Sequence, residues 1–290
     1  MSDLFMRSLP VDINIAVLIT CFNRVGYTIN CLENLYKSRL PSNFTFQVYL
    51  VDDGSTDETS QIIKTNYPEI VLLNGSGNLY WSGGMRYAWL KASENNYDYF
   101  LWLNNDTMIY EDSLYCLLKS SILLENQSII CGTTISKHDH KITYGGRLLS
   151  SNSHIVPNGE LVPCELVNGN FVLIPKRIYK VVGNIDSIFI HAFGDHDYGL
   201  RVLKNGFGCN IAPKIIGECE GNSLLPQWAN PDFLFLQRLK FFFSPLGNPP
   251  YIYFRYNARH FGFFIAIKQL MFLHFRLFFP KLWQKLKNYL

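Results

Sequence analysis

The sequence of 290 residues lacks several patterns that would assign it to a common class of protein. Its seven cysteines are scattered and include no Cys-x-x-Cys pair, which argues against a zinc cage and predicts reduced thiols in a cytoplasmic protein. Residues 1–14 contain no apolar segment long enough for a signal peptide. No stretch reaches about 18 uncharged apolar residues, so we predict that the chain has no transmembrane span.

Charged residues are also scarce, at 17% of the chain, whereas hydrophobic residues make up 48% and aromatic residues 15%. This composition excludes a disordered or coiled-coil chain. Acidic residues are absent from residues 233–290, which hold nine of the 26 Lys and Arg residues. We therefore predict one large domain over residues 1–228 and a basic, aromatic, helical extension over residues 229–290.

Apolar runs alternate with helical segments in the first hundred residues. The pattern predicts helices at residues 27–38 and 85–94, and strands at residues 15–20, 46–51, 70–74 and 97–103. Such alternation predicts parallel βαβ units, hence a Rossmann-like, mostly parallel α/β sheet flanked by helices. Residues 128–222 are less regular, with short strands and then a loop that enters a helix carrying Arg201.

Polar clusters follow three of the predicted strands: CFNR at 21–24, DDGSTD at 52–57 and NND at 104–106. Ligands of such sheets bind beyond the carboxyl ends of the strands. Each cluster alone also fits a turn or a helix cap, but three together favour a ligand site. Asp106 beside the amide oxygens of Asn104 and Asn105 is a suitable ligand set for Mg²⁺ or Mn²⁺.

Two further motifs carry candidate chemistry. GDHDYGLR places Asp195 and Asp197 around His196, and a carboxylate near a metal–diphosphate can act as a general base; a helix cap is the alternative. GNLYWSGG at 77–84, predicted as a loop, would bring backbone close to a phosphate or sugar, with Trp81 as an apolar face. It has neither the dinucleotide-binding nor the P-loop spacing.

Taken in order, ITCFNR, VDDGSTD, GNLYWSGGM, LWLNND, VNGNF and GDHDYGLR resemble the family-2 glycosyltransferases with a GT-A fold, over roughly residues 13–222. The likeness extends to bacterial rhamnosyltransferase-like enzymes that build O-antigen or capsular polysaccharide. The resemblance implies an inverting hexosyltransferase that uses Mn²⁺ or Mg²⁺. Its donor would be a nucleotide-diphosphate sugar, and its acceptor a hydroxyl of a glycan or lipid-linked oligosaccharide.

The resemblance also implies roles for single residues. Asp195 matches the catalytic base, supported by Asp197 and Arg201, and Asp106 matches the last residue of the DXD motif, which binds metal and diphosphate with Asn105 beside it. The residues that would line the donor pocket are Thr20, Phe22, Asn23, Asp52, Asp53, Asn78, Trp81, Gly83 and Gly84.

The sequence departs from the family pattern at several of these positions. The first aspartate of the DXD motif is Asn104, and the Glu that often precedes the base is Gly194. Arg86 stands where many relatives have Asn, and is expected to contact phosphate. A histidine that can join the metal is replaced by residues 218–220, Glu-Cys-Glu, so a third protein ligand is not assigned.

The extension mixes Phe, Leu and Trp with Lys and Arg, which is typical of amphipathic helices at a membrane interface that favour anionic lipid. We therefore predict a peripheral position on the inner face of the cell membrane. Packing on the enzyme body, or a homo-oligomer contact, is the alternative. Nucleic-acid binding is not expected, because the positive charge comes with dense aliphatic residues.

Two other functions remain open from the residues. A nucleotidyltransferase would share the sheet and the metal carboxylates, but it should have a basic triphosphate loop near its start, where CFNRVGYT offers only Arg24. A non-catalytic sugar- or lipid-binding protein would keep the fold without the activity, and Asn104 in the DXD position fits that alternative.

Overall fold

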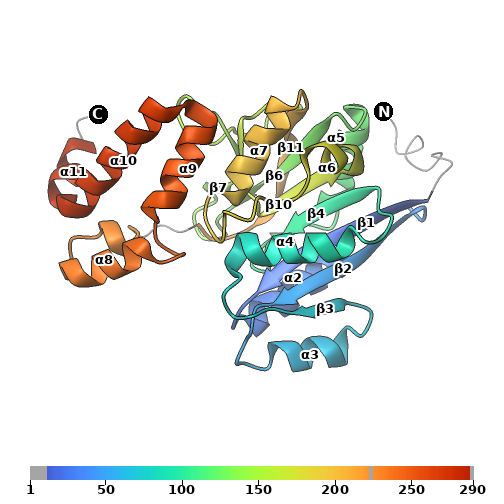
Figure 1. The fold of residues 1–290 in the computed structure, drawn as a ribbon. Helices are drawn as coiled ribbons and strands as arrows, with labels where there is room; N and C mark the ends of the chain where they lie inside the picture. The colour runs from blue at the N-terminus through green and yellow to red at the C-terminus, as the bar shows by residue number, and fades with distance from the viewer. Residues whose placement is uncertain (1–11, 222–224, 288–290) are drawn as a thin grey trace.

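A central β-sheet with helices on both faces forms the body of the protein, and the C-terminal helices stand at one side of it (Figure 1). The computed structural model describes residues 12–221 and 225–287. Within these residues, nine strands form the main sheet. In spatial order they are β3 (Val71–Asn74), β2 (Phe44–Asp52), β1 (Ile13–Cys21), β4 (Tyr99–Leu103), β10 (Phe171–Pro175), β6 (Ser128–Ile135), β11 (Gly208–Glu218) and β5 (Met108–Ile109), with β7 (Ile142–Tyr144) paired to β6 off this path.

The sheet is mostly parallel. Strands β3, β2, β1 and β4 run in the same direction, and β6 is parallel to β11. Strand β10 runs antiparallel between β4 and β6, and β5 is antiparallel to β11. A separate two-stranded sheet joins β8 (Gly146–Arg147) to β9 (Leu166–Val167). The predicted mixed α/β class is therefore confirmed.

Helices cover both faces of the sheet and continue beyond it. Helices α2 (Val25–Tyr36) and α5 (Ser113–Leu123) pack on one face, and α4 (Tyr80–Ala92) and α7 (Gly194–Lys204) pack on the other. The remaining helices are α3 (Thr59–Asn66), α6 (Lys176–Val182), η1 (Gln227–Ala229), α8 (Phe235–Phe243), α9 (Pro250–Phe261), α10 (Phe263–Phe278) and α11 (Pro280–Lys287).

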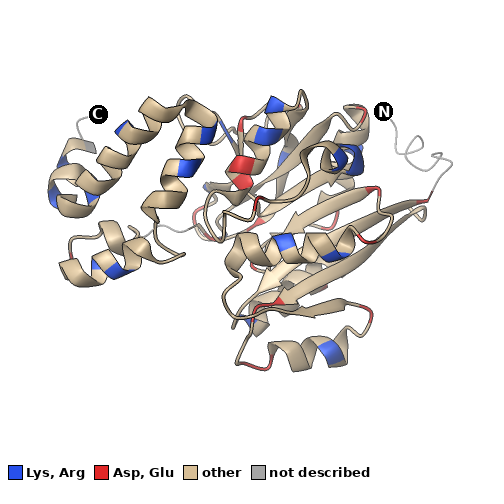
Figure 2. Cartoon of the chain, in the orientation of Figure 1, with Lys and Arg blue, Asp and Glu red and all other residues tan. Residues whose placement is uncertain are grey.

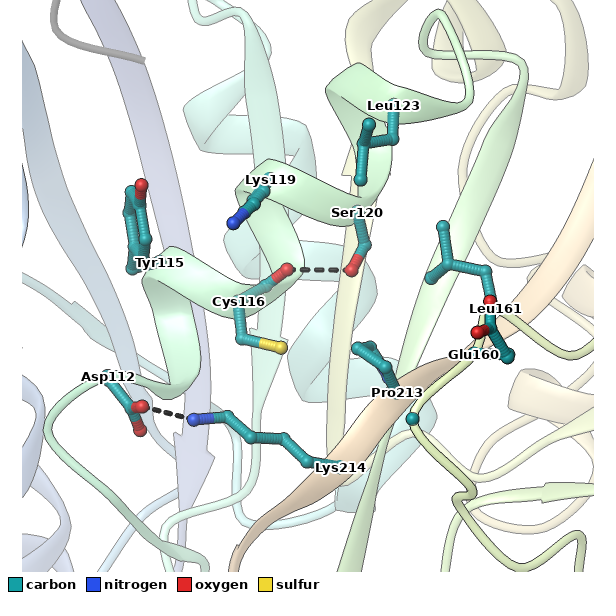
Figure 3. Close-up of a pocket in the computed structure, with 11 residues that line it drawn as sticks. Asp112, Tyr115, Cys116, Lys119, Ser120, Leu123, Glu160, Leu161, Pro213 and Lys214 are labelled. Atoms are coloured by element: carbon teal, nitrogen blue, oxygen red, sulfur yellow. Dashed lines mark hydrogen bonds and ion pairs between the residues drawn. The ribbon is translucent and has the colours of Figure 1, made fainter. Parts of the chain in front are cut away.

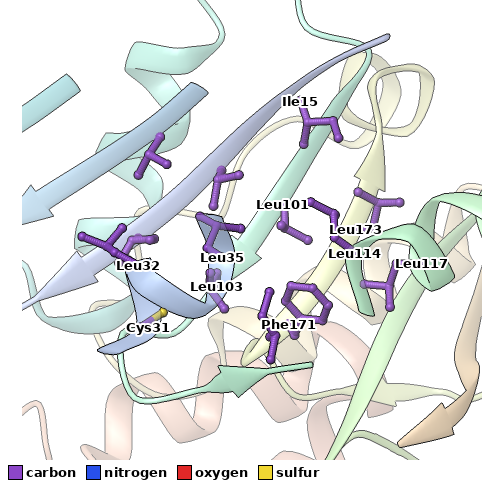
Figure 4. Packing of buried hydrophobic residues seen from close by; sticks show 14 of the residues in the cluster. Ile15, Cys31, Leu32, Leu35, Leu101, Leu103, Leu114, Leu117, Phe171 and Leu173 are labelled. Atoms are coloured by element: carbon purple, nitrogen blue, oxygen red, sulfur yellow. The ribbon is translucent and has the colours of Figure 1, made fainter. Parts of the chain in front are cut away.

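The core has two layers because successive strand residues point to opposite faces of the sheet. In β1, Ile15 packs with α2 and α5, whereas Leu18 packs with α4 and α7, and both are fully buried. This double burial explains the continuous apolar run of that strand. Figure 4 shows the first layer, in which Leu101 and Phe171 of the strands meet Leu32 of α2 and residues of α5.

The predicted strands and the first helix are found within two residues of their expected ends, but helix α4 begins five residues before the expected start at residue 85. Most of the predicted loop GNLYWSGG is therefore helical. Asp53, directly after β2, explains the early start, because its carboxylate accepts hydrogen bonds from the N–H groups of Leu79 and Tyr80 (2.8 and 2.9 Å). Gly84 lies inside the helix, where a Cβ atom would come within 2.1 Å of Thr20 Oγ1.

The C-terminal helices form a small apolar cluster of their own, built on Trp228, Phe242, Leu273 and Leu277. Helix α9 packs instead on α7 of the body, where Tyr256 joins a buried cluster with Phe189. In the described part of the chain, no single helix is both long and apolar enough to cross a membrane. Helices α10 and α11 together are long and apolar enough, but the chain bends by 115° between them.

Candidate active site

A cavity of about 820 Å³ opens where β1 and β4 end, and α4 and α7 begin at its rim. It brings together residues that lie far apart in the sequence. The predicted site residues that line it are Thr20, Phe22, Asp53, Trp81, Asn105, Asp106 and Asp195. The predicted residues that do not line it are Asn23, Asp52, Asn78, Gly83 and Gly84.

Asp106 and Asp195 open onto this one cavity because β10 is antiparallel to β4. The carboxyl end of β4 then lies beside the start of β10, where the N–H of Asn104 donates to the carbonyl of Asn170 (2.9 Å). Gly169, just before β10, donates its N–H to Asp195 Oδ2 (3.0 Å). The chain after β4 and the first turn of α7 are thus joined at one edge of the sheet.

Asp195 lies half-buried in the first turn of α7, a position that favours a negative charge. Its Oδ1 accepts a hydrogen bond from the N–H of His196 (2.8 Å), and its Oδ2 accepts the bond from Gly169. A Cβ atom at Gly169 would lie 2.3 Å from the ring of Trp81 and 3.4 Å from Asp195, so the indole covers this backbone beside the carboxylate. The two N–H donors fix the carboxylate at the cavity wall.

Asp106 also lines the cavity and is paired with a cation from the chain itself. Arg24 Nη1 donates to Asp106 Oδ2 at 2.7 Å, and the thiol of Cys219 lies 3.7 Å from Asp106 Oδ1. Burial, reinforced by the Asp106 carboxylate, raises the pKa of the Cys219 thiol to about 12, so the thiol is protonated at neutral pH. Asn104 Oδ1 accepts from Trp81 Nε1 (2.6 Å), which holds the indole in place.

The donor atoms around Asp106 limit the kind of metal site this chain can form. In the described residues, no group of three or more His, Cys, Asp or Glu side chains is placed to hold a metal ion. Mg²⁺ is commonly held by one or two carboxylates, substrate phosphate oxygens and water. Asp106 therefore fits a cation that binds together with a diphosphate, and not a cation caged by protein alone.

Several predicted donor-pocket residues are occupied in holding loops together. Asp52 accepts from the N–H of Ser55 (2.9 Å) and from the hydroxyl of Ser60, so it caps the turn that leads into α3. Asn23 Oδ1 accepts from the N–H of Thr56 (2.7 Å), which ties the loop after β1 to the loop after β2. Asn78 is exposed in the loop before α4 and does not line the cavity.

Arg86, expected to contact phosphate, does not line the cavity. Its Nη1 donates to the carbonyl of Phe189 (3.2 Å), and burial lowers its pKa. Arg201, expected to support Asp195, bonds Asp197 Oδ2 through Nε (2.8 Å). Arg86 thus contacts the segment before α7, and Arg201 forms an ion pair within α7.

Sequence reasoning missed cavity residues that have no strand-end signal. His191 and Phe193 precede α7, and Leu246 comes from the segment between α8 and α9. Arg24 was noted only as a basic residue, although its position after β1 in CFNR placed it at the ligand edge. Nothing in the sequence pattern around Leu246 indicates that it reaches this cavity.

A second hollow of about 500 Å³ lies between α5 and β11 and is lined by Lys119, Pro213 and Lys214, among others (Figure 3). Lys214 pairs there with Asp112. None of the predicted site residues lines this hollow. The candidate chemistry therefore belongs to the larger cavity.

A mostly parallel α/β sheet whose strand ends open onto a cavity with carboxylates from both halves is the arrangement of a GT-A glycosyltransferase. The sequence profile described as "Glycosyl transferase family 2" matches residues 16–171, more than half of the chain. The chain belongs to this family.

Relatives and solved structures agree with this assignment. Two proteins described as "Uncharacterized glycosyltransferase", from Rickettsia felis and Rickettsia bellii, are 24% and 25% identical over 133 residues, or 46% of this chain. The match spans only about a fifth of their length (21% and 18%).

Among solved structures, Staphylococcus aureus TarS 1–349 is similar with a TM-score of 0.54 at 15% identity, over 87% of this chain and 72% of that one. The mannosyltransferase PcManGT from Pyrobaculum calidifontis, in complex with GDP-Man and Mn²⁺, has a TM-score of 0.56 at 13% identity, over 99% of this chain and 89% of that one. These likenesses show the GT-A fold.

Proposed function

We propose that this glycosyltransferase moves a sugar, with inversion, from a nucleotide-diphosphate donor to a hydroxyl of a glycan or lipid-linked acceptor. The observation that supports this proposal is that Asp106 and Asp195, 89 residues apart in the sequence, both line one cavity. Rhamnosyl transfer in the synthesis of O-antigen or capsular polysaccharide is the biological setting that the sequence motifs suggest.

In the proposed reaction Asp195 accepts the proton of the acceptor hydroxyl while that oxygen attacks the anomeric carbon of the donor. The bond from this carbon to the diphosphate oxygen breaks, and its electron pair leaves with the nucleoside diphosphate. In an inverting transfer of this kind, the oxygen attacks the anomeric carbon from the side opposite the departing diphosphate. A positioned general base contributes about 10²–10⁴-fold to such a rate.

The donor side of the cavity would hold the diphosphate. Asp106 is the carboxylate that would bind Mn²⁺ or Mg²⁺ together with the phosphate oxygens, and the cation would offset charge on the departing diphosphate. Arg24 lies in the same wall, where its guanidinium suits a phosphate. Related structures are described with UDP, UDP-GlcNAc, and GDP-Man with Mn²⁺, so both uridine and guanosine donors belong in a test.

The decisive experiment measures sugar transfer and donor hydrolysis with a panel of nucleotide sugars, including rhamnose, galactose, galactofuranose and N-acetylhexosamine donors. We expect turnover with one donor class, and Asp195→Asn should lose nearly all of it while donor binding persists in calorimetry. Asp139→Asn, on an exposed loop that does not line the cavity, is the matched control. Comparable turnover in folded Asp195→Asn would remove Asp195 from the role of base.

The panel also separates the alternatives. Release of pyrophosphate from a nucleoside triphosphate and a sugar phosphate would identify a nucleotidyltransferase. Tight donor binding without transfer or hydrolysis, under any acceptor tested, would favour a non-catalytic sugar-binding protein. Either result would replace the proposed reaction.

We also propose that helices α10 and α11 contact the anionic inner surface of the cell membrane. Ala266, Leu273 and Leu277 of α10 are buried, whereas Phe264, Met271 and Phe278, spaced seven residues apart on another face, are 85%, 68% and 53% exposed. Helices α8 to α11 carry Lys and Arg and no Asp or Glu (Figure 2). An apolar face rimmed by basic residues suits an interface with anionic lipid.

Co-sedimentation with vesicles tests this contact. We expect binding to vesicles that contain phosphatidylglycerol, weak binding to phosphatidylcholine alone, and at least a tenfold loss in the double variant Phe264→Ser/Met271→Ser. Leu90→Ser, on the exposed side of α4, is the control for loss of an apolar side chain elsewhere. Unchanged vesicle binding by the double variant would overturn the membrane contact and favour packing on the body. A wild-type dimer that dissociates in the double variant would overturn it in favour of a homo-oligomer contact.

A further inference from the structure

Asp197, two residues after Asp195, is a completely buried carboxylate surrounded by basic side chains from two separate parts of the chain. Arg201 of its own helix bonds Asp197 Oδ2 (2.8 Å). Arg259 Nη1 and His260 Nε2, both from α9, lie 2.8 Å from Asp197 Oδ1. Arg259 also forms an ion pair with Asp186 Oδ2 through Nη2 (2.6 Å), so α9 is bonded both to α7 and to the segment before it.

A buried carboxylate is costly unless it is paired and hydrogen-bonded. Burial alone would raise the pKa of Asp197, but hydrogen bonds from His260 and Arg201 outweigh burial, and the pKa lies below its ordinary value. Asp197 is therefore charged, and two of its three partners come from α9. Removing them would leave a buried charge with one partner, which is more damaging than losing a surface ion pair.

A second contact joins α9 to the residue that starts α7. Phe193 has a left-handed backbone (φ 69°), which is unfavourable for a bulky residue and needs surrounding contacts to maintain it. Its ring stacks on Tyr256 of α9 at 4.9 Å, with Tyr253 at 5.8 Å. The carbonyl of Phe193 accepts from the N–H of Asp197 (2.8 Å), which closes the first turn around Asp195.

We infer that α9 is a positioning element of the active site: Arg259 and His260 fix Asp197, Tyr256 fixes Phe193, and the turn between these two contacts holds Asp195 toward the cavity. Arg259, His260 and Tyr256 act through Asp197 and Phe193 and do not touch substrate. This role rests on the proposed function of Asp195 as the base. It assigns to the C-terminal part of the chain a task in catalysis separate from any contact with lipid.

The test compares Arg259→Gln, Arg259→Lys and the control Arg255→Gln, which removes an exposed positive charge from the same helix. For Arg259→Gln we expect kcat to fall at least tenfold while KM for the donor stays within about threefold, because the donor side of the cavity is untouched. Arg259→Lys should recover a large part of kcat, and Arg255→Gln should match the wild type. His260→Gln is the second variant should Arg259→Gln fold poorly.

The pH profile gives a readout that a loss of folding would not. Removing the positive charge of Arg259 disfavours ionised carboxylates nearby, so the acid limb of the kcat profile should move to higher pH. The other charged or titratable groups that line the cavity or interact with Asp195 are Cys21, Arg24, Asp53, Tyr80, Asp106, Cys131, Tyr144, Arg147, His191, His196, Glu220 and Tyr256, and Asp197 lies two residues further along the chain.

Wild-type kcat and an unmoved acid limb in folded Arg259→Gln and His260→Gln would overturn the inference. So would an equal loss in Arg255→Gln, because that would report charge or stability in general. Hydrogen exchange gives an independent measurement: the amides of residues 193–198 should exchange at least tenfold faster in Arg259→Gln than in Arg255→Gln. Should the wild type transfer no sugar at all, the proposed function fails. Faster exchange of these amides in Arg259→Gln would still establish that α9 stabilises the first turn of α7.

Discussion

Replacement of Asp53 by Asn separates two roles that one carboxylate could have. The sequence motif places Asp53 among the donor-binding residues, and the structure places it at the cavity wall. Yet its Oδ1 accepts from the N–H of Gly77 (2.8 Å), and its Oδ2 accepts from the N–H groups of Leu79 and Tyr80. Three backbone donors leave little capacity for a donor nucleoside, so we expect Asp53→Asn to act mainly on stability.

The magnitude follows from these three bonds. In its better orientation an Asn side chain keeps its oxygen toward Leu79 and Tyr80 and turns an N–H₂ group against the N–H of Gly77. One bond to a charged group is lost, at about 1.5–3 kcal/mol, and two others weaken from charged to neutral acceptors. The negative charge at the start of α4 contributes a further 0.3–1 kcal/mol or so. The expected loss is about 3–5 kcal/mol.

Thermal unfolding and nucleotide calorimetry measure the two effects separately. At about 2–4 °C per kcal/mol for a chain of this size, Tm should fall by roughly 10 °C. At a temperature where both proteins are folded, the Kd for the donor nucleotide should rise less than tenfold. Glu58→Gln, which removes an exposed acidic group from the same loop, controls for charge. An unchanged Tm with a tenfold or greater loss of nucleotide affinity would refute this reasoning.

Three further outcomes follow from the geometry. Gly84→Ala should lower the free energy of unfolding by about 1–3 kcal/mol, because its Cβ would lie 2.1 Å from Thr20 Oγ1, whereas Gly83→Ala, with its nearest atom at 3.4 Å, should cost clearly less in urea titrations. EDTA should abolish transfer and Mn²⁺ or Mg²⁺ should restore it; full activity in chelator would contradict a cation at Asp106. For Asp186, burial raises the pKa, but the N–H of Ile188 and the Arg259 side chain outweigh it, and the pKa lies below the ordinary 3.8. The charged Asp186 therefore stabilises the fold above that value, and this contribution is lost as pH falls through its lowered pKa. In Asp186→Asn the free energy of unfolding should fall less steeply below about pH 4 than in the wild type. The same pH dependence of unfolding in both proteins would contradict this.

The sheet was predictable because its strands are buried on both faces. The run at residues 15–20 is apolar without interruption, which a half-exposed strand would not be, and β1 indeed has Ile15 and Leu18 buried on opposite sides. The ligand edge followed from the polar clusters at strand ends, and Asp106 lies in the cavity for that reason. These inferences depend only on local pattern and on the rule that parallel strands end at one edge.

The early start of α4 was not predictable, because two glycines discourage helix locally and the compensating contacts come from far along the chain. Asp53 caps the helix from 26 residues away, and Gly84 is needed only because the helix crosses Thr20 of β1. The acidic partners of Arg259 were equally hidden. They lie 62 and 73 residues earlier, in a segment whose charge pattern shows no link to the extension.

The position of α9 bears directly on how the chain is divided. A boundary at residue 228 follows the point where acidic residues stop, but it separates Asp197 from two of its three basic partners. A chain ending there would leave Phe193 without the ring of Tyr256 that stacks on it, and the cavity without Leu246. Basic residues without acidic neighbours in the sequence suggest a solvent- or lipid-facing surface, yet Arg259 and His260 pair with a buried carboxylate of the body. Helix α9 therefore packs as part of the body, and the surface that we propose to contact lipid begins with α10.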